Sequence, residues 1–320
     1  MKIFYEFIKN KDNFLVVHDF DVDGICSASL ISIALSENRK KFKNIASRLE
    51  NDTERIERLS KKYRNVIFLD IGDVKEDFLE MFDSCMIIDH HPVKEYPEDI
   101  VYINPRLKSP NAYIPCSYMV KSLVDKKYEW ISLAGTIGDM GFDLLKPFKI
   151  NEKNWKKTKI GKVALIIDSV KVISGKKECE KLVDFIVKNR SMDSIIKEYN
   201  YFYSLYKKEL DKLIKDFRKN KEVFGDFVLY QIFSKYRFTS TLATIISRKI
   251  KNKTIIISQK HENKIKVSLR SNIINLNSFL NKVLKGIEAK YGGHPKAAAI
   301  TFYNESDYEK FIERIKSSIF

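Results

Sequence analysis

The sequence has few cysteines and no long apolar run. Its four cysteines, Cys26, Cys85, Cys116 and Cys179, lie far apart and form no CxxC pair. This scatter argues against a disulfide framework and against a zinc–thiolate site, and it suits the reducing cytosol. No apolar run approaches the roughly 20 residues that cross a bilayer, and the opening MKIFYEFIKNK lacks the apolar core of a signal peptide. The sequence therefore predicts a cytoplasmic protein that has no membrane partner.

Acidic residues are fewer than basic ones. The chain of 320 residues has 58 Lys and Arg against 42 Asp and Glu, which gives a net charge of +16. An excess of this sign favours a polyanionic partner, nucleic acid before an anionic membrane surface. A lysine-rich proteome would explain the same excess, so the charge alone leaves both explanations open. The content of 44% hydrophobic residues indicates globular structure, and the length suffices for two domains.

The first 195 residues are predicted to form an α/β domain. Short apolar runs alternate there with helix-like segments and lie at 14–18, 45–49, 66–70, 85–89 and 100–104. Continuous apolar runs bounded by charge are typical of buried parallel strands. This alternation predicts a parallel doubly wound sheet, whose ligands bind beyond the carboxyl ends of the strands.

The rest of the chain is predicted to form a helical linker and a smaller α/β domain with a mixed sheet. The segment 206–221 is dense in charge with few apolar residues, which is typical of a partly exposed connecting helix. We expect domains at 1–195 and 223–320, joined by a helix at 196–222. The expected strands of the second domain lie at 227–233, 254–258, 264–271 and 297–303, and its helices at 239–251, 276–290 and 306–318.

Acids and histidines follow three of the predicted strands of the first domain. These candidate ligands are Asp21, Asp23, Asp70, Asp89, His90 and His91, and Asp139 lies in a fourth, otherwise apolar segment. A single aspartate at such a place is commonly a helix cap or a turn residue. Their recurrence at several strand ends, which meet at one edge of a parallel sheet, indicates a metal site instead.

The spacing of these residues also predicts a reaction class. In an extended segment Asp21 and Asp23 would point to one side while Val22 turns into the core. Carboxylates this close repel one another unless cations lie among them. Carboxylates mixed with imidazoles favour Mn²⁺ over Mg²⁺. Two such ions roughly 3.5 to 4 Å apart would activate water and clamp phosphate oxygens, which predicts hydrolysis of a phosphate ester or pyrophosphate.

Six motifs, taken in order, resemble those of the DHH phosphoesterase superfamily. HDFDVDG at 18–24, FLDIGD at 68–73, IDHHP at 88–92 and GTIGD at 135–139 are similar to its four catalytic-domain motifs. VSLRS at 267–271 and YGGHPKAAA at 291–299 are similar to the Arg-Ser and Gly-Gly-His motifs of the DHH-associated C-terminal domain. The resemblance therefore covers nearly the whole chain.

The resemblance implies a role for each motif residue. One Mn²⁺ would be held by His18, Asp21 and Asp70, and a second by Asp23, Asp70, His90 and Asp139, with Mg²⁺ or Co²⁺ as substitutes. His91 would contact the scissile phosphate while Asp89 orients a ligand. The substrate-binding residues implied in the second domain are Arg270, Ser271, Gly292, Gly293 and His294, placed across an interdomain cleft.

Two departures from the family pattern accompany these roles. His18 precedes Asp21 by three residues, whereas many members have four, and the shorter spacing is that of archaeal-type members. Ala299 stands where the family usually has glycine after its Gly-Gly-His motif.

Within the superfamily, the two-domain layout is similar to archaeal RecJ-like nucleases and to nanoRNases. The resemblance therefore implies a Mn²⁺-dependent exonuclease that acts on single-stranded DNA or RNA from an end, in DNA repair or DNA replication. One alternative is a nanoRNase or phosphoadenosine-phosphate phosphatase, which acts on very short substrates. A second alternative is a replisome-associated scaffold with weak or no activity. An active enzyme of this type would also be compatible with replisome partners such as GINS.

Overall fold

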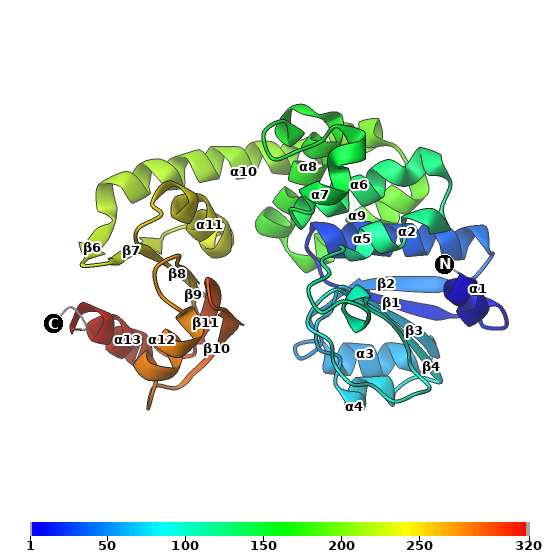
Figure 1. The fold of residues 1–320 in the computed structure, drawn as a ribbon, viewed down its shortest axis with the longest axis horizontal. Helices are drawn as coiled ribbons and strands as arrows, with labels where there is room; N and C mark the ends of the chain where they lie inside the picture. Colours follow the sequence, from blue (N-terminus) through cyan, green and yellow to red (C-terminus); the bar gives the residue numbers. More distant parts are fainter. Residues whose placement is uncertain (1, 318–320) are drawn as a thin grey trace. The chain divides into compact units, whose positions relative to one another are not determined.

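The computed structural model describes residues 2–317, which divide between Tyr203 and Ser204 into two compact units. Each unit is built around a sheet of its own (Figure 1). The first sheet is parallel throughout and the second is mixed, so the predicted fold class is confirmed. No helix within residues 2–317 is long and apolar enough to cross a membrane.

The first unit contains a five-stranded sheet in the order β2-β1-β3-β4-β5. Its strands are β1 (Phe14–His18), β2 (Phe42–Ala46), β3 (Asn65–Leu69), β4 (Ser84–Ile88) and β5 (Val101–Ile103). Strands β1 and β3 are in register from Phe14 with Asn65 to His18 with Leu69. Because every strand runs in the same direction, the segments that follow β1, β3 and β4 lie at one edge of the sheet.

Helices cover both faces of this sheet, as a doubly wound fold requires. Side chains such as Val16 face α2, α6, α8 and α9, whereas Val17 faces α3 and α4. These helices are α2 (Val22–Glu37), α3 (Thr53–Ser60), α4 (Glu76–Leu79), α6 (Glu129–Gly138), α8 (Lys159–Ser174) and α9 (Lys176–Asn189). A short helix that the sequence did not indicate, α1 (Lys2–Ile8), places Phe4 and Phe7 in the same core as Val16.

The predicted strand at 45–49 is wrong in position, because β2 begins at Phe42 and ends at Ala46. A hydrogen-bonded turn follows it, in which the Ser47 hydroxyl donates to Asp52 and accepts the N–H of Leu49. Leu49 has a φ of +60°, which a continuing strand does not allow. Local side-chain bonds of this kind compete with the strand and end it.

The second unit contains a six-stranded sheet in the order β10-β11-β9-β8-β7-β6. Its strands are β6 (Glu222–Phe224), β7 (Phe227–Ile232), β8 (Thr254–His261), β9 (Lys264–Arg270), β10 (Ala289–His294) and β11 (Ala297–Phe302). Strands β7 and β8 are parallel and the other pairs are antiparallel. Helix α11 (Thr239–Lys249) packs on β8 and β9, while α12 (Leu276–Val283) and α13 (Glu305–Ser317) share a core with the face that carries Leu229.

The predicted helix at 276–290 is wrong beyond Val283, where α12 ends. Gly286 has a φ of +74°, which breaks the helix, and Ala289 already pairs with Phe302 in the sheet. A single helix, α10 (Met192–Asn220), contains the point at which the two units divide.

Candidate metal centre

Asp21 and Asp23 lie at the amino end of α2, so the prediction that they share an extended segment is wrong. Asp21 is the N-cap, and its Oδ1 accepts the N–H of Gly24 at 3.0 Å. Asp23 belongs to the first helical turn and is fully buried. A Cβ at Gly24 would lie 2.2 Å from the carbonyl oxygen of Asp19, so only glycine allows this close start. The positive end of the helix dipole stabilises carboxylates at this position.

The carboxylate of Asp23 is held by the short helix α5 (Cys116–Met119). The backbone N–H groups of Cys116 and Ser117 donate to it at 2.6 and 3.0 Å, and the Ser117 hydroxyl donates as well. Burial raises the pKa of Asp23 to about 7, and the nearby charge of Asp21 acts in the same direction, while the bonds from α5 oppose the rise. The structure thus fixes Asp23 while leaving it costly to ionise.

Asp70 follows β3 in a left-handed conformation, with a φ of +59°. Aspartate tolerates this region better than most residues, and such conformations cluster at functional sites. Its N–H donates to the carbonyl of Ile88 at 3.0 Å, which ties it to the neighbouring strand. Burial and the charges of Asp21 and Asp23 raise its pKa well above the usual value, and its carboxyl shares a hydrogen bond with Asp21.

Asp139 is the C-cap of α6 and lies opposite His90. Its Oδ2 is 3.3 Å from Nε2 of His90, and the same nitrogen is 3.2 Å from Oδ1 of Asp70. Burial raises the pKa of Asp139 to about 9, and the charges of Asp23 and Asp21 add to this effect. Three carboxyl groups from different segments therefore meet around one imidazole.

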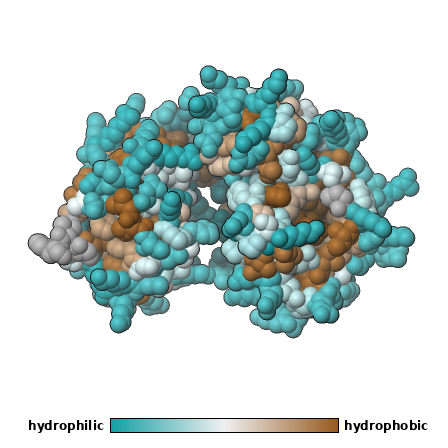
Figure 2. Space-filling view, viewed as in Figure 1, coloured by the Kyte–Doolittle hydropathy of each residue, from teal (hydrophilic) through white to brown (hydrophobic). Residues whose placement is uncertain are grey.

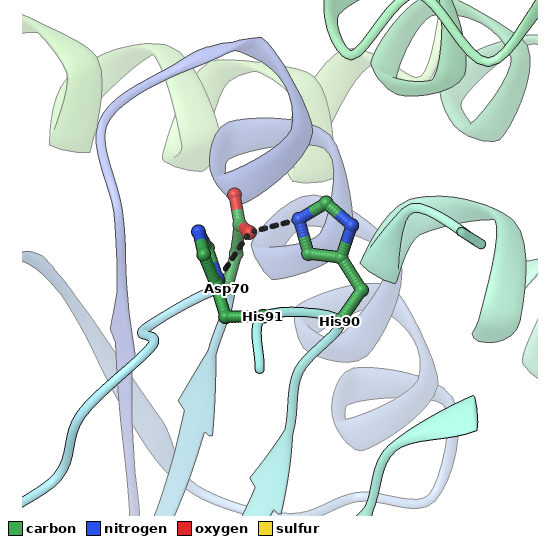
Figure 3. A group of neighbouring side chains, drawn as sticks. All are labelled: Asp70, His90 and His91. Carbon is green, nitrogen blue, oxygen red and sulfur yellow. Dashed lines mark ion pairs between the residues drawn. The ribbon is translucent and has the colours of Figure 1, made fainter. Parts of the chain in front are cut away.

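The rings of the two histidines after β4 both lie beside the carboxyl of Asp70 (Figure 3), but they differ in exposure. His90 is buried, and burial lowers its pKa to about 4, so it is neutral at pH 7, the form that binds metals. His91 is half-exposed, and its Nδ1 lies 2.8 Å from Oδ1 of Asp89, whose other oxygen accepts the His91 N–H. The bond to Asp89 raises the pKa of His91 and fixes the orientation of its ring.

Three groups of side chains could each hold a metal ion, because the donor atoms within each group lie within 4.8 Å of one another. They are Asp70 with His90 and His91, Asp23 with His90 and Asp139, and Asp23 with Asp70 and Cys116. Within residues 2–317, His18 and Asp21 are not part of such a group. His18 is fully buried at the end of β1, where its Nδ1 lies 2.7 Å from the carbonyl oxygen of Asp19. Metal binding by His18 and Asp21 stays a prediction.

The donor set fits a divalent cation. Nε2 of His18 is buried and has no hydrogen-bond partner among residues 2–317, a costly arrangement for a nitrogen atom without a ligand. Burial raises the pKa values of the carboxyls of Asp23, Asp70 and Asp139, and the repulsion between neighbouring acids adds to the rise. A cation among them would relieve this repulsion, and oxygen with imidazole nitrogen suits Mn²⁺.

A hollow of about 250 Å³ adjoins these groups, and Asp70 and His91 form part of its wall. Its wall also includes Arg48 and Lys75. Nε of Arg48 lies 3.3 Å from Oδ1 of Asp19, and its guanidinium lies over the ring of Phe20 at 4.8 Å. Asp19, Glu50 and Asp73 line the same space, and Lys75 pairs with Glu50 at 3.6 Å, so the wall beside the predicted metal ligands carries charges of both signs.

The loop after β5 supplies contacts that the sequence did not predict. Asn104 donates to the carbonyl of His91 at 3.0 Å, and Arg106 donates to that of His90 at 2.7 Å. The hydroxyl of Tyr113 lies 3.0 Å from the carbonyl oxygen of Asp139 and 3.2 Å from its Oδ2, and its ring lies 5.1 Å from that of His90. The only sequence signal for this loop is the run Asn-Pro-Arg directly after an apolar strand, which predicts a turn but no contact.

The residues predicted to bind substrate in the second unit lie on β9, β10 and the turn after β9. Arg270 donates to the hydroxyls of Ser240 and Thr244 of α11 at 3.0 and 3.2 Å. His294 is exposed at the end of β10. Ser271 is buried, and its hydroxyl bonds Thr254 and accepts two backbone N–H groups of the next turn. That hydroxyl supports the turn, and a substrate contact by Ser271 stays a prediction.

Gly292 and Gly293 differ in whether the structure would allow a side chain at their position. Gly293 has a φ of +146°, and a Cβ there would lie 2.3 Å from the carbonyl oxygen of Ala297. Gly292 has open space where a Cβ would stand. The hairpin therefore needs glycine at 293 but not at 292.

Residues 13–138 match the DHH family, N-terminal domain, and residues 228–319 match the DHHA1 domain. No curated protein matches the chain significantly.

Several solved structures share the fold of the chain. A structure of exonuclease RecJ bound to manganese has a TM-score of 0.74 at 14% identity, over 99% of this chain and 92% of that one. CDC45 from Entamoeba histolytica has a TM-score of 0.62 at 10% identity, over 99% and 97%. The pGpG-specific phosphodiesterase PggH from Vibrio cholerae has a TM-score of 0.57 at 15% identity, over 97% and 99%. At these identities the likeness is one of fold.

Proposed function

This chain belongs to the DHH superfamily of metal-dependent phosphoesterases, and we propose that it is a Mn²⁺-dependent exonuclease acting on single-stranded DNA or RNA. One observation carries this proposal: at the carboxyl edge of a parallel sheet, the carboxyls of Asp70 and Asp139 meet at Nε2 of His90, and Asp23 lies in one donor group with His90 and Asp139. The structural likeness to exonuclease RecJ bound to manganese supports the metal and the exonuclease reaction.

We propose that two ions bind here. Asp23, Asp70, His90 and Asp139 would hold one, and Asp70 would share the other with Asp21 and His18. When bound, such ions supply Lewis-acid activation of phosphate and of water. The left-handed Asp70 is suited to the shared position because its carboxyl hydrogen-bonds with Asp21 and also lies beside His90.

His91 is proposed to contact the scissile phosphate. Its side chain is 41% exposed, and the bond to Asp89 favours the protonated ring, which donates to anions. Asp89 acts through His91, since it holds both the ring and the N–H of that residue. The hollow beside His91 has Arg48 and Lys75 in its wall together with Asp19, Glu50 and Asp73, and it would take the phosphates of the terminal nucleotide once bound cations offset these acids.

The second unit is proposed to supply further phosphate contacts. Arg270 and His294 carry the donors, and Gly292 leaves open space where backbone can approach a ligand. Ser271 would take part through the turn that it supports.

A second candidate function is hydrolysis of very short substrates, such as dinucleotides. The likeness to a pGpG-specific phosphodiesterase, which covers nearly all of both chains, favours it. The third possibility is a replisome scaffold, but every acid and histidine to which the motifs assign a role is present in the sequence. An intact donor set favours an enzyme over a scaffold.

End-labelled single strands and dinucleotides, incubated with Mn²⁺, separate these functions. We expect stepwise release of nucleotides from one end of DNA or RNA, and labels at the 5′ and 3′ ends will give the polarity. Asp70→Asn should abolish release, and His91→Ala should lower kcat roughly a hundredfold or more. Hydrolysis of dinucleotides alone would replace the exonuclease with the second candidate, and unchanged activity of both variants would refute the proposed site.

A further inference from the structure

The first unit carries a lysine-rich surface away from the metal centre. Between Lys146 and Lys162 the chain has seven lysines and a single acid, Glu152. We define the lysine patch by the five of them that lie between residues 153 and 162, which are Lys153, Lys156, Lys157, Lys159 and Lys162. All five are exposed, and Figure 2 shows a hydrophilic surface over the region that Figure 1 labels α8.

Most charges of the lysine patch are not neutralised by the protein. Lys159 pairs with Asp193 at 2.7 Å. Within residues 2–317 the other four form no ion pair with an acid. The basic segment of α10 differs, because Glu209, Asp211 and Asp216 are interleaved with its lysines. A ten-residue stretch with five lysines and no acid therefore gives a strong local positive potential.

The lysine patch also surrounds a hollow and lies beside aromatic rings. A hollow of about 410 Å³ is lined by four of its lysines together with Thr158 and Tyr203. Nζ of Lys156 lies 5.3 Å from the ring centroid of Trp155. The Thr158 hydroxyl caps α8 by accepting the N–H of Gly161 at 2.9 Å, and the helix dipole adds positive potential at this end. Cations with nearby aromatic rings are typical of surfaces that bind single strands.

Helix α8 joins the lysine patch to the metal centre within one compact unit. Lys159 begins the helix, and the charge of Lys171, near its end, acts directly on Asp21. The twelve residue steps from Lys159 to Lys171 correspond to roughly 18 Å of helix. A strand whose end lies at the metal centre would thus need several nucleotides to reach the lysine patch, whereas a dinucleotide is too short.

We propose that the lysine patch binds the phosphate backbone of a single strand several nucleotides from the cleaved bond. This inference rests on the proposed exonuclease function and deepens it, because the lysine patch gives long strands an affinity that very short substrates lack. The contact is to the backbone, so it carries no sequence preference.

The test compares two variants with equal changes of charge. In the first, Lys156, Lys157 and Lys162 are replaced by glutamine. In the matched control, Lys9, Lys61 and Lys62 are replaced, which are exposed residues shortly before β1 and β3, at the opposite edge of the sheet. Binding of a labelled strand of about 20 nucleotides is followed by fluorescence anisotropy over a range of salt. Hydrolysis of this strand and of a dinucleotide is measured with the same preparations.

We expect the patch variant to raise the KM for the long strand roughly tenfold while kcat and dinucleotide hydrolysis stay unchanged. The slope of log K against log salt should fall in magnitude by about 2, since each lost phosphate contact contributes about 0.7. An unchanged slope and KM, or an equal loss in the control, would overturn the role of the lysine patch. If the parent hydrolysed neither substrate but its salt slope still depended on the lysine patch, the proposed function alone would fail.

Discussion

Tyr113 contacts two predicted metal ligands at once, through its hydroxyl on Asp139 and its ring on His90. No sequence motif marked it, because its position depends on the path of a loop between β5 and α5. It lies 26 residues from Asp139 along the chain. The hydroxyl is shared between the carbonyl oxygen and the carboxylate of Asp139, so it helps to fix the orientation of that ligand.

Tyr113→Phe should therefore weaken Mn²⁺ binding. Loss of one hydrogen bond to a carboxylate corresponds to about 1.5 kcal/mol, or roughly tenfold in affinity. Titration of the protein with Mn²⁺ by calorimetry measures the change, and the Mn²⁺ dependence of hydrolysis should shift to match. Tyr118→Phe removes a hydroxyl from the next tyrosine of the chain and is the control. Equal Mn²⁺ affinities in parent and Tyr113→Phe would contradict the orienting role.

Asp89 determines the protonation of His91, which gives a prediction on pH. The bond to Asp89 raises the pKa of His91, so the donor form survives to higher pH than in a free imidazole. If His91 acts protonated, kcat falls as the pH rises through its pKa. In Asp89→Asn the pKa of His91 drops, and the fall in kcat should move to lower pH. A pH–kcat profile whose alkaline limb is the same in both proteins would rule this out.

At the scale of elements, the hairpin β10–β11 contains two adjacent glycines that differ in backbone conformation and in the space around them. Gly293→Ala places a Cβ against the carbonyl of Ala297 at a φ of +146°, so we expect a loss of about 1–3 kcal/mol in unfolding free energy. Gly292→Ala meets no atom and should keep its stability. If substrate approaches the backbone there, the KM of Gly292→Ala rises all the same. Thermal melts with KM measurements on both variants test this, and an unaltered KM for Gly292→Ala would remove Gly292 from the substrate site.

The elements also show where sequence patterns are sufficient. Parallel strands bring their carboxyl ends together whatever their exact boundaries, so Asp70 and His90 could be predicted as neighbours, whereas Asp139 lies at the end of helix α6 and was joined to them only through its motif. The conformation of Asp21 and Asp23 could not be predicted, because a helix cap and an extended pair have the same spacing in sequence. The sequence pattern did not predict strand β10 either, because no change in polarity marks the end of α12 at Val283. The helix is broken by the positive φ of Gly286, and β10 follows it.

For the whole molecule, the sequence predicted the fold class and the order of its parts better than it predicted contacts across segments. Alternating apolar runs encode strands and helices locally. The contacts of Ser117 with Asp23, 94 residues apart, and of Arg106 with the backbone of His90 depend on how the connections fold over the sheet. Such contacts decide the electrostatics of the site, and hence how its acids affect the stability of the chain.

The acids of the metal centre should make the stability of the metal-free protein fall as the pH rises above neutrality. Burial raises the pKa of Asp139 to about 9 and that of Asp23 to about 7, above the value of 3.8 expected when unfolded. The folded state therefore binds more protons, and each extra proton corresponds to about 1.4 kcal/mol lost per pH unit. Below about pH 6.5 His90 acts in the opposite direction, because its pKa is lowered to about 4.

Thermal unfolding from about pH 7 to about pH 9 isolates the contribution of the acids. With chelator present, the Tm of the parent should fall across this range. With Mn²⁺ the Tm should be higher and should depend less on pH, because the carboxylates then face a cation. Asp139→Asn carries a neutral side chain of the same shape, so its Tm in chelator should fall less. If, with chelator present, the Tm of the parent changed with pH in the same way as the Tm of Asp139→Asn, Asp139 would not be held protonated by its surroundings.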